Sequence, residues 1–403
     1  MANTFITPTA VSREFLRVLH SMVPFCSSID RQYDNSTEFG GVKRGQTINI
    51  RKPTKYSIRT GAVANVQDQG ETFSPLTVDQ QIGVDVSFSS AEMTQTLDDF
   101  SKRVITPAAS RMAAELESLV MTKMMTSTFN QVGAAGTIPQ SALVYLQAGQ
   151  KLDEFLALRD NKRCVVINPA AQANSVDALK GLFNPTGTIG GQYKNGEMGD
   201  GLGFMFKMGQ LVPALTTGDR LLAASTLVDG TVATQGSTTI HVDGFTGATA
   251  TVKEGEIITV AGVYAVNEAG ASTGNLQQFV VTADATAASN EVDLLVQPAM
   301  YTTGAKKNIS AFPTDEGVVT FVGSASTAYT QNSAHHESAY TLATVDLEVP
   351  KGVDFAGREA MDGISIRVVR DFDVINDVFI TRFDLLFGSV AQRPELGCRI
   401  IGN

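Results

Sequence analysis

Hydrophobic and polar positions alternate most regularly in LTVDQQIGVDVSF, residues 76–88. From 78 to 88 every second residue is apolar, and only Gln80 interrupts the apolar side. A period of two is typical of a strand with one buried face. The pattern therefore predicts a single β-strand of thirteen residues, which is about twice the usual length.

A second, shorter strand is predicted at 47–51, and a basic, turn-rich loop separates it from the first. This loop, RKPTKYSIRTGAVANVQDQGETFSP, is polar throughout and closes with Ser74–Pro75. We expect the two strands to pair across the loop and to form a long β-arm that projects from the body of the protein. A polar segment of this kind cannot build a core of its own. Such an arm needs a partner surface.

The sequence predicts five helices, from apolar residues at helical spacing or from a capping residue before the segment. Their ranges are 15–23, 89–100, 106–125, 141–160 and 174–183. The segment at 106–125 is the longest, with Thr106 as the N-cap and Pro107 at the first position, where proline is tolerated. Its apolar stripe is Ile105, Ala109, Met112, Leu116 and Leu119, and further methionines follow at 121, 124 and 125. Methionine at helical spacing indicates core packing rather than a ligand groove.

The last two helices flank a short buried strand, CVVI at 164–167. Asn168–Pro169 follows this strand and is expected to act as a stop between it and the helix at 174–183. Together these segments predict a βα unit.

Between residues 219 and 345 the composition changes, and Thr, Ala, Gly and Val dominate. Short alternating runs, separated by Gly, Asn and Asp turns, are TTIHV, TATV, EIITVAGVYAV, QQFVVTA, EVDLLV and VVTFV. This pattern indicates a small all-β sandwich or barrel. Its flanks are typical of an α+β fold, so 219–345 is interpreted as a domain inserted into a larger one and able to fold alone.

The net charge of −10 is unevenly distributed. Residues 1–60 hold nine basic and four acidic residues, a balance of +5. Residues 219–345 hold four basic and twelve acidic residues, a balance of −8. This polarity suggests that the N-terminal part meets acidic surfaces while the inserted domain stays solvated.

Composition sets further bounds. A chain of 403 residues with 43% hydrophobic and 18% charged residues is typical of a folded soluble protein of two or three domains. Its apolar runs are too short to span a bilayer, and its N-terminus lacks the pattern of a secretory signal. We therefore expect it to be made and kept in the cytoplasm, without a membrane partner. Cys26, Cys164 and Cys398 form no Cys-x-x-Cys pair, which predicts reduced, buried thiols rather than disulfides or a zinc site.

Motifs of catalysis and cofactor binding are weak. Gly199, Gly201 and Gly203 form G-x-G-x-G, but Phe204 stands where the dinucleotide-binding fingerprint G-x-G-x-x-G needs its third glycine, and no phosphate-binding P-loop occurs in the sequence. The adjacent pair His335–His336 is predicted to lie in a surface turn. RDFDVINDVF at 370–379 lacks the glycine and the terminal glutamate of a calcium loop. The sequence thus predicts no enzyme activity, no cofactor and no metal site.

Three segments resemble one known family. FSSAEMTQTLDDFSKRVITPA at 88–108 is similar to its segment before the spine helix, and GEMGDGLGFMFKMGQLVP at 196–213 to its Gly-rich passage. The most specific likeness is the block at 339–400, AYTLATVDLEVPKGVDFAGREAMDGISIRVVRDFDVINDVFITRFDLLFGSVAQRPELGCRI. These segments resemble major coat proteins of tailed double-stranded DNA phages. The fold of that family is the Hong Kong 97 fold. The acidic inserted β-domain further resembles the short-tailed Salmonella phage coat branch, which carries an inserted β-barrel.

The resemblance implies an α+β fold with an N-arm, an extended β-loop, a long spine helix, and peripheral and axial domains. The implied divisions are an N-terminal arm at 1–44, an extended β-loop at 45–88, spine helix with peripheral and first axial parts at 89–218, an inserted barrel at 219–345, and the remaining peripheral and axial part at 346–403.

The implied function is structural: self-assembly into the pentamers and hexamers of an icosahedral head that encloses the double-stranded DNA genome. The implied partners are other copies of the chain, a scaffolding protein and a portal protein, with non-specific contact to packaged DNA. The implied location is the virion, after assembly in the cytoplasm of the host bacterium. Two alternatives stay open, an encapsulin-like or prophage-derived compartment shell and a cytosolic enzyme with a regulatory β-domain.

A subunit interface is the candidate site. The basic residues of the arm suit ion pairs with acidic residues of a neighbouring subunit. The hypothesis joins Arg44, Arg51, Lys52, Lys55 and Arg59 of one subunit to Asp98 and Asp99 of the next.

Overall fold

The structure is a computed structural model, and it describes residues 8–34, 47–56, 58–59, 61–64, 66, 72–89, 105–179, 198–246, 249–374 and 378–403. The chain divides into two compact units. The first comprises Met1–Ile50, Ser74–Met121 and Tyr340–Val390, and the second comprises Arg51–Phe73, Thr122–Ala339 and Ala391–Asn403.

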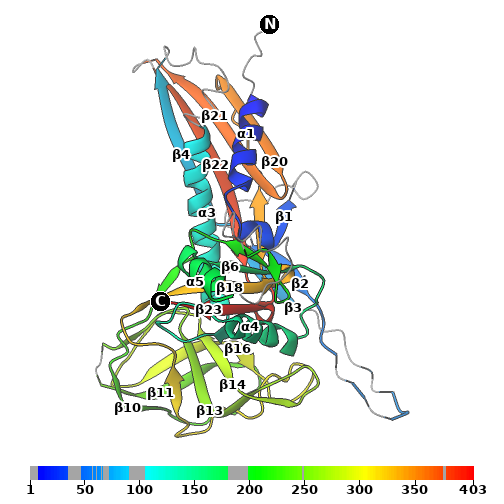
Figure 1. The fold of residues 1–403 in the computed structure, drawn as a ribbon, viewed down its shortest axis with the longest axis vertical. Helices are drawn as coiled ribbons and strands as arrows, with labels where there is room; N and C mark the ends of the chain where they lie inside the picture. The colour runs from blue at the N-terminus through cyan, green and yellow to red at the C-terminus, as the bar shows by residue number, and fades with distance from the viewer. Residues whose placement is uncertain are drawn as a thin grey trace. The chain divides into compact units, whose positions relative to one another are not determined.

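A six-stranded sheet forms the centre of the first unit (Figure 1). Its order is β1 (Asp30–Asp34), β19 (Thr341–Val345), β22 (Val378–Val390), β21 (Ile364–Asp373) and β20 (Phe355–Met361), while β4 (Gln80–Ser89) also pairs with β22. β1 and β19 are parallel, and the other pairs are antiparallel. The long strand β22 therefore holds this sheet together, because it pairs with β19, β21 and β4.

Two helices cover one face of this sheet, the face turned to the viewer in Figure 1. They are α1 (Pro8–His20) and the first part of α3 (Thr106–Ser127). The apolar side of α1 packs against β20 and β21, and Phe15 stacks on Phe383 of β22 with ring centroids 4.5 Å apart. Both rings are fully buried. The predicted methionines of α3 are buried as well, as core packing requires.

The prediction of a single strand at 76–88 is wrong. The structure has two strands, β3 (Thr72–Thr77) and β4, with a break at Val78–Asp79. β3 pairs with β2 (Thr47–Lys52) in a two-stranded sheet, so the predicted partner of 47–51 is only the first part of the alternating segment. The physical reason is that Leu76 and Val78 enter a small apolar cluster with Ile48 and Ile50, whereas β4 continues into a different sheet.

The pairing of β4 with β22 depends on a glycine. Gly83 lies opposite the buried Asp384, and a Cβ atom at position 83 would lie 2.8 Å from Asp384 Oδ1. The carboxylate of Asp384 occupies the space that a side chain would need. There it accepts hydrogen bonds from Arg367 and Arg382, which compensate its buried charge.

The second unit contains a seven-stranded sheet. Its order is β5 (Gln131–Val132), β23 (Gly397–Ile401), β18 (Ala328–His336), β6 (Arg163–Ile167), β8 (Phe204–Met208) and β7 (Asp200–Gly201), while β9 (Ala214–Thr216) pairs with β18. Helix α4 (Ala142–Glu154) begins after Ser141, whose hydroxyl accepts a hydrogen bond from the Leu143 amide, and packs against β23 and β18. The next helix is α5 (Pro169–Leu179). Short 3₁₀ helices occupy Cys26–Ser28 in the first unit and Glu337–Ala339 and Pro394–Leu396 in the second.

β6 ends at Ile167, just before the predicted stop at Asn168–Pro169, but the next helix already begins at Pro169, so its predicted start at 174 is wrong. The side chain of Asn168 accepts a hydrogen bond from the Ala171 amide, 2.9 Å away, and Pro169 is the first residue of α5. An Asx cap followed by proline is a start signal for a helix, because the first amide of a helix has no intrahelical partner.

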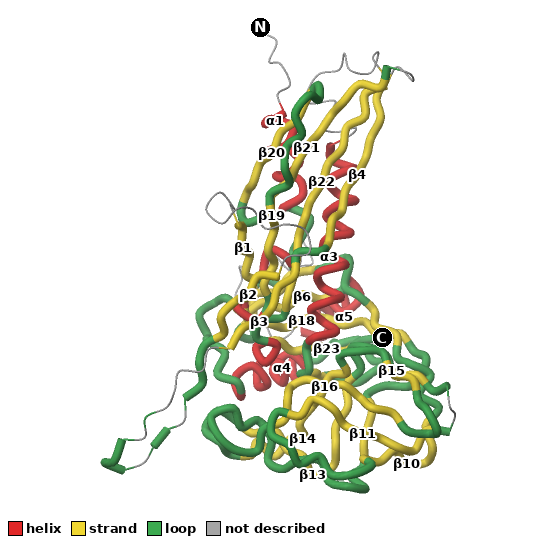
Figure 2. Tube along the Cα trace, turned by 180° about the vertical axis from the view of Figure 1, so that it is seen from behind, coloured by secondary structure: helices red, strands yellow, loops and turns green. Residues whose placement is uncertain are grey.

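The inserted β-domain is a nearly closed barrel within the second unit (Figures 1 and 2). Its order is β10 (Leu222–Val228), β11 (Ser237–Phe245), β16 (Val292–Met300), β14 (Ser272–Val281), β13 (Ile257–Val266) and β17 (Val319–Phe321). A bridge between Leu227 and Val318 connects the two ends of this order. Two further strands of this region, β12 (Thr251–Val252) and β15 (Ala285–Thr286), pair with each other in a separate two-stranded sheet. All six alternating runs of the sequence lie in or overlap these strands, and their apolar sides form one buried core.

A buried ion pair lies where the chain enters and leaves the barrel. We call this region the neck, and define it as Gly218, Arg220, Glu256, Val322 and Gly323. Arg220 Nε lies 2.6 Å from Glu256 Oε2, with only 2% and 3% of the two side chains exposed. Arg220 also donates to the carbonyls of Val322 and Gly323, while Glu256 accepts from the Gly218 amide. The neck thus joins the chain entering the barrel to the chain leaving it.

Within 219–345, β18 and β19 belong to the two sheets described above rather than to the barrel. The divisions at 44, 88, 218 and 345 stay predictions.

Candidate interaction surfaces

The segment that follows β2 presents apolar side chains to solvent. Ile58 is 95% exposed, Val63 87% and Val66 90%, and Tyr56 is more than half exposed. Apolar side chains that gather on one exposed segment mark an interaction site.

The predicted interface residues fall into two groups. Arg44, Asp98 and Asp99 lie outside the described residues. Arg51 and Lys52 lie at the end of β2, and Lys55 and Arg59 lie in the exposed segment.

The four described basic residues of the predicted interface differ in exposure and in their contacts. Arg51 is exposed. Lys52 is half-buried, and burial lowers the pKa of its ammonium group. Lys55 Nζ donates to Glu268 Oε1 of the inserted barrel at 2.7 Å, and Arg59 donates to the carbonyl of Gly61. The structure thus gives Lys55 an acidic partner within its own chain, on the acidic domain.

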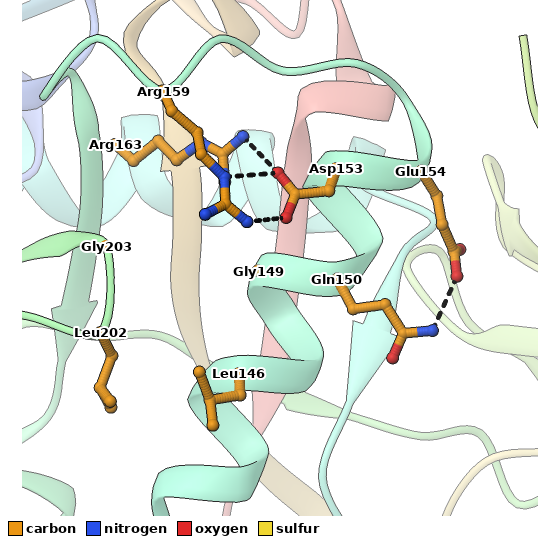
Figure 3. A pocket seen from close by; sticks show the side chains of 9 residues that line it. All are labelled: Leu146, Gly149, Gln150, Asp153, Glu154, Arg159, Arg163, Leu202 and Gly203. Carbon is orange, nitrogen blue, oxygen red and sulfur yellow. Dashed lines mark hydrogen bonds and ion pairs between the residues drawn. The ribbon is translucent and has the colours of Figure 1, made fainter.

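A hollow of about 470 Å³ lies beside the end of α4 (Figure 3). Asp153 receives hydrogen bonds from Arg159 and from Arg163, whose Nη2 lies 2.7 Å away. The hydrogen bond from Arg159, together with Arg163, lowers the pKa of Asp153. The carboxylate is thus held ionised by two cations, which suits an ion pair that fixes the start of β6 and does not suit an acid or base.

His335 and His336 are buried, so their predicted placement in a surface turn is wrong. They are the last residues of β18, opposite Cys164 and Arg163 of β6. His336 Nε2 lies 3.1 Å from Asp160 Oδ1. Successive side chains of a strand point to opposite faces of its sheet, so the burial of both residues shows that both faces of the sheet are covered at the end of β18.

Sequence reasoning missed a cluster of ionisable groups on the inserted barrel. His241 of β11 lies directly opposite Asp293 of β16, and its Nδ1 lies 2.7 Å from Asp293 Oδ1. Its Nε2 lies 3.5 Å from Asp229 Oδ2 and 3.4 Å from Glu291 Oε2. The hydrogen bond with Asp293 raises the pKa of His241. The alternation of TTIHV places His241 on the outer face, but only the strand register brings the acids to it.

All three cysteines are free and buried, as predicted. Burial raises the pKa of Cys398 to about 12, which leaves this thiol protonated and unreactive. Among the described residues, no helix combines the length and apolar character needed to cross a membrane.

Comparison with known proteins places the chain in a family. Its sequence matches the family described as "P22 coat protein - gene protein 5" over residues 2–402. No curated protein matches the chain.

Similar solved structures include one from Mycobacterium phage Che8, at 11% identity and a TM-score of 0.43, covering 94% of this chain and 91% of that one. Another is the mature capsid of bacteriophage PhiM1, at 10% identity and a TM-score of 0.42, covering 92% of this chain and 84% of that one. A third is the capsid of an empty GTA particle, at 9% identity and a TM-score of 0.42, covering 100% and 92%.

The family match spans nearly the whole chain, including both units and the barrel. The expected α+β fold with an inserted barrel is confirmed, and so is the expectation of a structural protein rather than an enzyme. The chain belongs to the P22 coat protein family, and it is a major capsid protein of a tailed phage, located in the virion, that forms the icosahedral head.

Proposed function

We propose that this coat protein assembles into pentamers and hexamers, and that the resulting head encloses double-stranded DNA. Assembly would begin in the host cytoplasm with a scaffolding protein and a portal protein. The family supports self-association, and the charge distribution supports a lining that touches DNA without gripping it. Tight DNA binding depends on many phosphate contacts from basic residues, whereas this chain carries a net charge of −10.

The observation that carries the proposal is the exposed segment after β2. In the isolated chain, Ile58, Val63 and Val66 are each at least 87% exposed. Association is stabilised by about 25 cal/mol for each Å² of apolar surface that it removes from water. A neighbouring copy is the partner that a self-assembling coat protein supplies in excess. The segment would therefore lie over an adjacent subunit.

The basic residues beside this segment would set its register. Arg51 and Lys52 precede the apolar positions, and Arg59 lies among them. Charged groups at the rim of an interface mainly fix orientation and accelerate association. We keep Asp98 and Asp99 of the adjacent subunit as their proposed acidic partners. Arg44 and Lys55 belong to the same proposal, with Lys55 able to exchange Glu268 for an intersubunit partner.

Reversing two charges in the arm tests this interface. We expect Arg51→Glu combined with Lys52→Glu to reduce the yield of closed shells at least about tenfold, because each reversal turns an attraction into a repulsion at the rim. The measurement is the fraction of protein in shells by sedimentation and negative-stain microscopy.

The matched control is Lys306→Glu combined with Lys307→Glu, which makes the same change in net charge on the inserted barrel. A compensating pair, Asp98→Lys with Asp99→Lys, should restore shells in the arm variant. Normal shell yield in the arm variant would show that these two residues do not contribute to assembly. Failure of the compensating pair alone would reject Asp98 and Asp99 as the partners.

A further inference from the structure

The ionisable cluster on the inserted barrel combines an imidazole from one segment with three carboxylates from two others. Asp229 follows β10, His241 lies in β11, Glu291 immediately precedes β16, and Asp293 lies in β16. Among the residues that the structure describes, the recorded ion pairs of these three acids are all with His241. One imidazole therefore faces three carboxylates, and negative charge is in excess whether or not the ring is protonated.

The spacing of the ligand atoms matches a metal coordination sphere. A tetrahedral ion with metal–ligand bonds of about 2.1 Å holds its ligand atoms about 3.4 Å apart. His241 Nε2 lies 3.5 Å from Asp229 Oδ2 and 3.4 Å from Glu291 Oε2. One atom from each of Asp229, His241 and Glu291 lies within 4.8 Å of the other two. Two of the three distances between these ligand atoms thus already have the length that a bound ion would impose.

Asp293 has a separate role. It holds Nδ1 of His241 at 2.7 Å, which directs Nε2 toward Asp229 and Glu291. A carboxylate that binds the other ring nitrogen is the usual support of a metal-bound histidine, because it fixes the tautomer and the ring orientation. Asp293 is therefore a positioning residue, whereas the other three residues supply the ligand atoms.

We propose that Asp229, His241 and Glu291 form a binding site for a divalent first-row transition metal ion on the outside of the inserted barrel. An imidazole nitrogen with two carboxylate oxygens suits Zn²⁺, Co²⁺ or Mn²⁺, while Mg²⁺ and Ca²⁺ prefer oxygen ligands alone. Water completes the coordination. The ion joins the end of β10 to β11 and β16, and so ties together three neighbouring parts of the barrel wall.

Cobalt titration of the full-length protein tests the site. Co²⁺ added to the metal-free chain is expected to give visible absorption bands that saturate at one ion per chain, and Zn²⁺ should remove them by competition. His241→Ala should abolish the bands, and Glu291→Gln should weaken binding at least about tenfold. Asp293→Asn should weaken it by about 10–100-fold, as loss of a supporting carboxylate does.

Asp243→Asn is the matched control, since it removes a carboxylate two residues along the same strand, outside the set. It should bind Co²⁺ as the unmodified chain does. Circular dichroism of each variant checks folding, and Glu291→Gln serves as the decisive variant if His241→Ala does not fold. The proposal is overturned if the unmodified chain shows no saturable Co²⁺ binding, or if folded His241→Ala or Glu291→Gln binds as tightly as the unmodified chain.

Discussion

Glu256→Ala is expected to lower the free energy of unfolding of the barrel by about 3–5 kcal/mol, because it leaves the guanidinium of Arg220 buried without its partner. The two side chains are 2% and 3% exposed, so water cannot replace the lost carboxylate. The amides of Gly218 and Lys253 would also lose their acceptor. Urea denaturation followed by far-ultraviolet circular dichroism measures the change.

The neighbouring ion pair between Lys253 and Asp284 supplies the control. Lys253 Nζ lies 2.7 Å from Asp284 Oδ2, but both side chains are exposed. Exposed ion pairs contribute little to stability. Lys253→Ala should therefore leave the urea midpoint nearly unchanged. An unchanged urea midpoint in Glu256→Ala would mean that the buried ion pair of the neck does not stabilise the barrel.

Phe383→Ala is expected to destabilise the first unit by about 3–5 kcal/mol, the usual range for truncating a buried phenylalanine. Phe383 lies in β22, and its ring stacks on Phe15 of α1. The cavity would open between the sheet and α1, so the amides of α1 should exchange their hydrogens faster. Thermal or urea denaturation and hydrogen exchange measure the two effects.

Phe372→Ala is the matched control on the same sheet. Its ring is 37% exposed and contacts Phe379 at a centroid distance of 4.8 Å, so its loss should cost only about 1 kcal/mol. If both variants lose the same stability, or if α1 keeps its protection in Phe383→Ala, the stacked pair does not anchor the helix.

Local patterns predicted the elements that depend on local chemistry. The long helix after Thr106 and the strands of the inserted barrel were identified because their apolar periodicity, caps and turns all lie within short segments. The same kind of reasoning placed the start of the helix after β6 at 174, although this helix begins at Pro169. An Asx cap and proline start a helix as readily as proline ends one, and only the Asn168 hydrogen bond to Ala171 decides between them.

Features that depend on strand pairing were not predictable. The alternation from 76 to 88 continues through a change of sheet, because period two is preserved on both sides of the break. Burial of both His335 and His336 requires that both faces of the sheet are covered at the end of β18, which is a matter of tertiary packing. The cluster around His241 needs the register that sets it opposite Asp293. Long-range pairing of this kind leaves no signal in a single sequence.

The proposed interface was predictable only in part. The basic character and missing core of the segment after β2 indicated a partner surface, and the exposure of Ile58 and Val66 fits that interpretation. The contact of Lys55 with Glu268 was not foreseen, since the two residues are 213 positions apart.

Electron microscopy of the expressed protein, alone and with its scaffolding protein, tests the central claim most directly. A coat protein that builds the head of a tailed phage should yield closed icosahedral shells with pentameric and hexameric capsomers, or sheets of such capsomers when closure fails. A population of small compact particles that never forms capsomers or shells under either condition would contradict the account.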